Sequence, residues 1–303
     1  MWMILVLFYG VVKGAREAIK KKALKKNSVI EVLVVYTLLS FIFCLPQAGN
    51  AGGLAAAQYA LIAFKSFCIF IAWICSFKAI DHLPISMYGV LDLSRVLFAT
   101  LLGVVVLHET MNGMHILGLA IVLLGLILLK FKPGFIKRAE MKEMLESGTA
   151  MEKVRSAVSN DSSKTWIYVL LAFVSCILNA VSGTLDKILM KDMNSSQLQF
   201  WYMLFLVIYY LLYVVITRTK IGSSAWKNGW IWALAILFVA ADKALFIANG
   251  DPASRVTVMT LIKQTGTIVT ILAGKFVFKE KNVAYRLFCA GVILIGVVLG
   301  VLA

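Results

Sequence analysis

Charge is scarce in this sequence, and proline is scarcer still. Only 15% of the 303 residues are charged, 61% are hydrophobic, and four are proline. A water-soluble domain of this composition would precipitate, so the chain belongs in lipid. The few prolines fit long unbroken helices, because every backbone amide in hydrocarbon needs an internal partner. A transmembrane β-barrel is excluded, because its strands alternate polar and apolar residues whereas the apolar runs here are continuous.

Sequence motifs typical of enzymes, metal sites and channels are missing as well. His82, His108 and His115 fall near the ends of apolar runs, and no HExxH, GxSxG or nucleotide-binding loop is present. The five cysteines lack metal-ligand spacing and are expected to pack between helices. A channel would need a filter-like loop, which is also absent. We therefore expect no enzyme, no cofactor and no metal site. The net charge of +15 lies in clusters between apolar runs, which indicates membrane topology and no nucleic acid partner.

Ten apolar segments are long enough to cross a bilayer as helices. They lie near residues 1–19, 29–46, 55–77, 84–107, 112–131, 166–187, 197–217, 228–247, 254–278 and 283–302. The first is interrupted by Lys13 and Arg16, and we expect a retained helix because no basic leader or cleavage site precedes it. One long polar stretch divides the chain, which predicts a repeat over 1–132, a basic linker over 133–164 and a second repeat over 165–303. A short surface helix is expected at Ile136–Val158.

The two halves are similar when they are aligned at one constant offset. This offset aligns Glu109 with Glu280, Gly103 with Gly274, and Gly125 with Gly296. Because five helices are an odd number, the second half must enter the membrane in the opposite sense to the first. Many secondary transporters use such inverted repeats to expose a central site alternately to either face. The sequence therefore predicts an all-α integral membrane protein of ten transmembrane helices in two inverted five-helix repeats.

Basic residues are distributed unevenly among the connections. In or beside the odd-numbered connections lie 23 lysines and arginines, against 3 at the even-numbered ones. The positive-inside rule then places the odd connections in the cytoplasm and both termini outside.

Two stretches resemble the EamA-type transporters of the drug/metabolite transporter superfamily. They are AIDHLPISMYGVLDLSRVLFATLLGVVVLHETMNGMHILGLAIVLLG and IKQTGTIVTILAGKFVFKEKNVAYRLFCAGVILIGVVLG, and the resemblance extends over nearly the whole chain. It implies a cavity bounded by spans three, four, eight and nine, and export or exchange of small metabolites. It also implies cytoplasmic termini, opposite to the charge distribution. The first helix departs from the apolar pattern of the family, since it reads KGAREAIKKKALKK.

Seven polar side chains inside the spans are candidates for substrate binding. They are Lys65 on the third span, Asp92 and Arg95 on the fourth, Asp242 and Lys243 on the eighth, and Lys263 and Gln264 on the ninth. A charge at mid-membrane costs at least about 2.5 kcal/mol, so each needs a partner or a polar cavity. Two acids against four bases leave positive charge in excess, which favours an anionic or zwitterionic solute such as an amino acid. Either acid could instead meet an amine or a coupling proton.

Other interpretations of these residues remain open. The same charges could form buried structural pairs that fix helix packing. A multidrug or organic-cation exporter is the alternative function, and it would need an unpaired membrane carboxylate. Other polar and aromatic residues in the spans are expected to have structural roles. We expect helix packing from Asn179 and Ser182, interface anchoring from Trp73 and Tyr88, helix capping from Glu109 and Glu280, and an interfacial ion pair of Asp186 with Lys187. We expect a multi-pass protein of the plasma membrane that contacts lipid and a small-molecule substrate and can act as a monomer.

Overall fold

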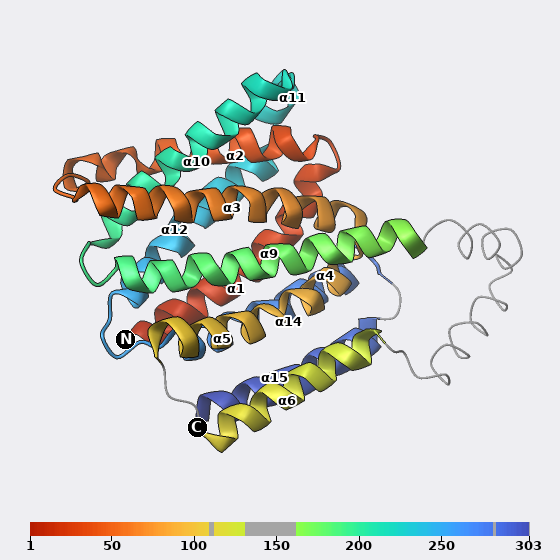
Figure 1. Cartoon of the computed structure of the whole chain (residues 1–303). Helices are drawn as coiled ribbons and strands as arrows, with labels where there is room; N and C mark the ends of the chain where they lie inside the picture. The colour runs from red at the N-terminus through yellow and green to blue at the C-terminus, as the bar shows by residue number, and fades with distance from the viewer. Residues whose placement is uncertain (109–111, 131–161, 281–282, 303) are drawn as a thin grey trace, which may run out of the picture.

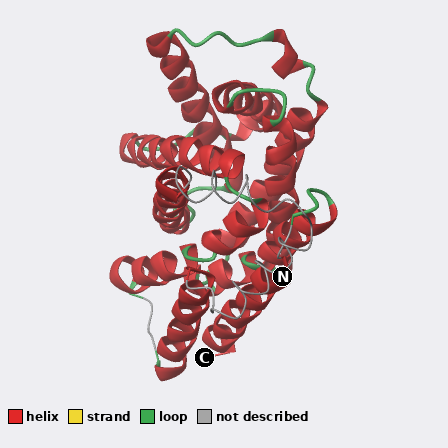
Figure 2. Cartoon of the chain, turned by 90° about the vertical axis from the view of Figure 1, so that its right-hand side faces the viewer, coloured by secondary structure: helices red, strands yellow, loops and turns green. Residues whose placement is uncertain are grey.

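The computed structural model describes residues 1–108, 112–130, 162–280 and 283–302, and every regular element within them is a helix (Figures 1 and 2). The helices of the first half are α1 (Trp2–Leu24), α2 (Val29–Cys44), the short 3-10 helix η1 (Leu45–Asn50), α3 (Ala56–His82), α4 (Ile85–Asp92), α5 (Arg95–Leu107) and α6 (Gly113–Lys130). Those of the second half are α9 (Ser162–Leu189), α10 (Ser195–Thr217), α11 (Ser223–Trp226), α12 (Gly229–Asn249), α13 (Val256–Lys263), α14 (Thr265–Phe276) and α15 (Val283–Leu302). The expectation of an all-helical protein is confirmed for these residues.

Seven stretches are long and apolar enough to cross a membrane. They are Val29–Asn50, Ala56–His82, Ile85–Leu107, Thr165–Leu189, Ser195–Thr217, Gly229–Asn249 and Val256–Phe276. The other three expected spans are also helical, as α1, α6 and α15. The apolar parts of α6 and α15 are shorter, at Gly113–Gly125 and Val283–Gly296, and α1 is not among the seven. Glu109 and the expected surface helix at Ile136–Val158 lie outside the described residues.

The helices pack in layers with a paired pattern. Figure 1 shows α2 and α10 at one edge, α1, α3, α9 and α12 in the middle, and α6 beside α15 at the opposite edge. Helix α1 packs against α12 and α14, while α9 packs against α3 and α5. Similarly, α2 packs against α12, and α10 packs against α3. Each of these helices of one half therefore has a counterpart in the other with matching neighbours.

Two long apolar spans are each broken near their middle. Between α4 and α5, the amides of Leu93 and Ser94 donate to carbonyls three residues back, at 3.1 and 3.0 Å. Between α13 and α14 the break falls at Gln264, whose carbonyl accepts from the amide of Thr267 at 2.9 Å. Bonds of this 3-10 type replace the regular i→i−4 bonds and interrupt the helix. The offset that aligns Glu109 with Glu280 also aligns Leu93 with Gln264, so the two breaks fall at matching positions of the two halves.

The ends of the broken spans also match. His108 follows α5 with φ 54°, and Lys279 lies in the turn after α14 with φ 52°. Both residues are in the left-handed region, which non-glycine residues rarely adopt, and the offset between the halves aligns them as well. The carboxylate of Glu280 then accepts from the amides of Ile85 and Ser86 at 2.5 and 3.1 Å. Glu280 was expected to cap the next helix in the chain. It caps α4 of the other half, because the turn brings it there.

Helix α1 crosses α14 at very short range. A Cβ atom placed on Gly14 or Gly266 would overlap the backbone of the other helix, and one placed on Gly10 would lie 2.7 Å from the Oγ1 atom of Thr265. Gly10 and Gly14 form a GxxxG pattern, which allows helices to approach closely in membranes. The sequence therefore places a helix carrying many charges directly against the break at Gln264.

Candidate functional site

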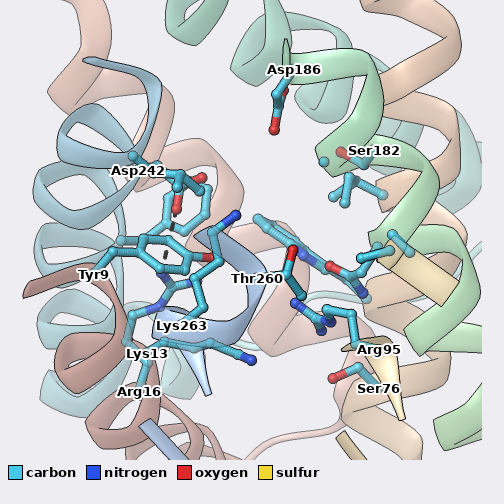
Figure 3. Close-up of a pocket in the computed structure, with 18 of the residues that line it drawn as sticks. Tyr9, Lys13, Arg16, Ser76, Arg95, Ser182, Asp186, Asp242, Thr260 and Lys263 are labelled. Atoms are coloured by element: carbon cyan, nitrogen blue, oxygen red, sulfur yellow. Dashed lines mark hydrogen bonds and ion pairs between the residues drawn. The ribbon is translucent and has the colours of Figure 1, made fainter. Parts of the chain in front are cut away.

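A cavity lies among α1, α3, α5, α9, α12 and α13, at the centre of the helices (Figure 3). About 80 Å³ of it can hold the centre of a water-sized molecule, which is room for several waters or one compact solute. Both halves of the chain contribute to its walls. In Figure 3, Asp186, Asp242, Arg95, Lys13 and Lys263 point toward the same space from different helices.

Helix α1 supplies more charge to this cavity than any other described helix. Lys13, Arg16, Glu17 and Lys20 line it, and each is at most 7% exposed. Residues spaced by three and four lie on one face of a helix, so all four side chains project to the same side. Lys13 and Arg16 interrupt the first apolar run, and they are among the 23 basic residues in or beside the odd-numbered connections. Both residues lie inside α1. Without them, lysine and arginine are still far more numerous at the odd-numbered connections than at the even-numbered ones.

Asp92 joins the first helix to the break between α4 and α5. Its carboxylate pairs with the amine of Lys13 and, at 2.8 Å, with the guanidinium of Arg95. On the opposite wall, Arg16 pairs with Asp242 of α12 at 3.5 Å. Helix α1 is therefore tied by ion pairs to both halves of the protein. Pairing offsets part of the cost of burying these charges.

A second set of pairs completes the network. Lys65 of α3 lies 3.1 Å from the carboxylate of Asp186 on α9, and Lys20 lies 2.8 Å from that of Glu17. The expected pair of Asp186 with Lys187 is wrong. The amine of Lys187 points to the next loop, where it donates to the carbonyls of Asn249 and Asp251 and to the Oγ atom of Ser254. Adjacent helical residues point in different directions, which explains the separation.

Aromatic rings cover several of the cations. The guanidinium of Arg16 lies 4.6 Å from the ring centre of Phe238, and the amine of Lys65 lies 3.5 Å from that of Tyr202. Lys263, for which the described residues include no ion-pair partner, has its amine 5.6 Å from the ring centre of Tyr9. Ring faces attract cations and partly replace the water lost on burial.

The structure divides the seven predicted site residues into three groups. Lys65, Arg95, Asp242 and Lys263 line the central cavity, and Asp92 lies beside it in a smaller adjoining pocket. Gln264 is fully buried at the second break, and neither atom of its amide has a hydrogen-bond partner. Lys243 lies away from the cavity, where its amine donates to Gln47 and Ser196 at 2.9 and 2.8 Å.

Several wall residues were expected to have other roles. Trp73 and Tyr88 line the cavity, although interface anchoring was their expected role. Asn179 and Ser182, assigned to packing, line it too. The spacing of the polar residues along α1 was the sequence signal that could have located the missing wall, since they fall on a single helical face.

The charges around the cavity do not balance. The bases are Lys13, Arg16, Lys20, Lys65, Arg95 and Lys263, and the acids are Glu17, Asp92, Asp186 and Asp242. Excess positive charge of two units remains in a buried site, where electrostatic interactions are much stronger than in water. Within the described part of the chain, no group of His, Cys, Asp and Glu is placed to hold a metal ion. The arrangement is suited to binding a charged polar solute.

Comparisons with known proteins concern the family and the fold. A model of the EamA-like transporter family matches residues 1–131 and 166–302. One solved chain, described only as a protein crystal structure, is similar over 99% of this chain and 96% of its own, with a TM-score of 0.67 and 13% identity. At that identity the likeness shows the fold alone. No curated protein sequence matches the chain.

Proposed function

The chain belongs to the EamA-like transporter family, and on that premise we propose that it exports or exchanges a small polar metabolite, anionic or zwitterionic, by alternating access around the central cavity. The family is one of membrane transporters and not of enzymes. The observation that carries the proposal is the central cavity, which is lined by charges from both halves with bases in excess over acids. A buried charged chamber of this kind is costly to build and is typical of solute and ion pathways.

Alternating access requires two halves that can move against each other, and we propose that these are two inverted five-helix repeats, near residues 1–132 and 165–303. The mirrored packing of α1 and α9 supports this arrangement. So do the two helix breaks at Leu93 and Gln264, since broken helices line the central sites of many transporters.

Contacts between the halves support the same symmetry. Glu31 in the first turn of α2 accepts from the amide of Gly222 at 2.9 Å, and Gln197 in the first turn of α10 donates to the carbonyl of Gly52 at 2.7 Å. Both side chains also complete a capping box at the start of their own helix. Each half therefore holds a loop of the other half by an equivalent device.

The competing function is export of organic cations, and the ion pairs count against it. A cation exporter needs a carboxylate free to bind its substrate, but Asp92, Asp186 and Asp242 each have a basic partner. We further propose that the protein lies in the plasma membrane and that one chain forms a complete pathway. If a proton is coupled to transport, we propose that the carboxylate of Asp92 or Asp242 binds it.

A flux assay with the purified protein in liposomes tests the proposal. Amino acids, organic anions and quaternary amines are loaded separately, and exchange of each radiolabelled solute is followed. We expect exchange of at least one anion or zwitterion. Transport of hydrophobic cations alone would overturn the proposal.

Replacement of Lys65 with methionine should abolish transport and lower the thermal stability of the protein, because the buried Asp186 loses its ion-pair partner. The change removes the amine that lies 3.1 Å from Asp186 and leaves that carboxylate facing Lys263 across the cavity. Lys78→Met is the matched control, because Lys78 lies on the same helix but is exposed. If Lys65 only fixes packing, pairing the change with Asp186→Leu would restore transport, and that result would remove Lys65 from the site.

A further inference from the structure

The excess charge of the cavity has a definite location. Asp92 is shared by Lys13 and Arg95, so its single charge neutralises only one of the two cations. The second uncompensated cation is Lys263, for which no ion pair exists among the described residues. The other bases around the cavity each have an acid of their own. Two positive charges therefore remain without a protein counterion, and both lie beside a helix break.

Unused hydrogen-bond donors lie at the same two breaks. Arg95 is the first residue of α5, and its Nε atom is buried without a partner. Gln264 directly precedes α14, and its buried side-chain amide also has no partner. A buried donor without a partner costs free energy. Arg95 lines the cavity, so its Nε atom is available to a bound solute, whereas Gln264 lies behind the cavity wall. The following helices begin here too, and their N-terminal ends favour negative charge.

Arg95 and Lys263 line the cavity from α5 and α13, two helices that pack against each other. Figure 3 shows their side chains on either side of Thr260, which also lines the cavity. Each comes from the broken span of a different half, so a solute bound between them touches both halves. The space for it is small, at about 80 Å³ for the centre of a water-sized molecule, and therefore suits a compact solute.

We propose that the transported solute is a compact dianion, a dicarboxylate or a phosphate monoester, whose negative charges are bound by Arg95 and Lys263. This inference rests on the proposed transport function and narrows its substrate class. A dianion brings the charge of the occupied cavity to zero. A monoanion leaves one positive charge uncompensated, and a zwitterion leaves two, and uncompensated charge is costly among buried side chains. Both kinds of dianion also carry several acceptor oxygens for the unused donors.

Solutes of similar size and different charge test the substrate class. Succinate and glycerol phosphate carry two charges, lactate carries one, and serine is a zwitterion. Each is measured for counterflow in liposomes and for its thermal stabilisation of the purified protein, in a buffer without small anions. We expect at least about 10-fold better exchange for a dianion than for lactate or serine, the effect of one strong charge-assisted contact. The two dianions separate carboxylate from phosphate chemistry.

The possible failures of this experiment are distinguishable. Efficient exchange of serine or lactate without exchange of either dianion overturns the dianion assignment and leaves the proposed transport function in place. Absence of exchange for these four solutes, and for the amino acids, organic anions and quaternary amines of the flux assay, overturns both the dianion assignment and the proposed transport function.

A variant series locates the charge. Lys263→Gln removes one of the two uncompensated charges, so the preference for succinate over lactate should fall about 10-fold. Lys263→Arg keeps the charge and should keep the preference. Lys275→Gln is the control, since Lys275 is exposed near the end of α14. An unchanged preference in a folded Lys263→Gln protein overturns the proposal, and if that variant does not fold, the wild-type solute series decides.

Discussion

Replacement of Gly183 with leucine should abolish transport and leave the folded protein intact. Gly183 lies on α9 and lines the central cavity, and a Cβ atom added there would meet no other atom within 4 Å. The leucine side chain therefore extends into the space reserved for solute. Overpacking a filled site costs about 1–3 kcal/mol, so exchange should fall about 10-fold or more. Leucine favours a helix over glycine by about 1 kcal/mol, so the thermal stability of the variant should equal or exceed that of the wild type.

Gly291→Leu is the matched control for this experiment. Gly291 lies on α15, also has open space around its Cβ position, and does not line the cavity. Counterflow and thermal unfolding are measured for both variants. Equal transport by Gly183→Leu and the wild type would mean that solute does not pass through the cavity.

Replacement of Asp92 with asparagine should have the largest effect on stability. Lys13 and Arg95 would be left side by side without the carboxylate that both of them bind. Loss of one partner from a buried ion pair costs about 3–5 kcal/mol, because the remaining charge is neither solvated nor paired. We expect low abundance in the membrane, a lower unfolding temperature of the purified protein, and loss of transport.

A second substitution distinguishes loss of charge balance from loss of a substrate ligand. Lys13→Met in the Asp92→Asn background removes one of the two unpaired cations, so abundance and thermal stability should recover in part. A single Asp92→Asn variant with wild-type stability would contradict the importance of this three-residue network.

Much of the fold could be predicted from the sequence, because membrane helices are selected by long apolar runs. The constant offset between the halves was visible in the glutamates and glycines, and the same offset relates the helix breaks at Leu93 and Gln264. The breaks themselves were not predicted. No proline or glycine lies at either position, so the local sequence lacks the usual signal for an interrupted helix.

The cavity was harder to predict than the fold. Four of the candidate residues on the apolar spans do line it, but α1 was undervalued because its charges look like a solvated helix end. Their burial depends on the close crossing with α14 at Gly14 and Gly266, a contact between segments near opposite ends of the chain. Lys243 shows the reverse error, since a charge within an apolar run can also point to a polar loop, here at Gln47 and Ser196.

Accessibility of Ser182 from the two sides of the membrane is the most direct test of alternating access. Ser182 lies on the cavity wall and is 3% exposed (Figure 3). The five buried native cysteines are first replaced with alanine, Ser182→Cys is introduced, and a membrane-impermeant thiol reagent is added to either face of proteoliposomes. We expect modification from both faces, and slower modification when the transported solute is present. Modification from one face only, or from neither, would contradict alternating access.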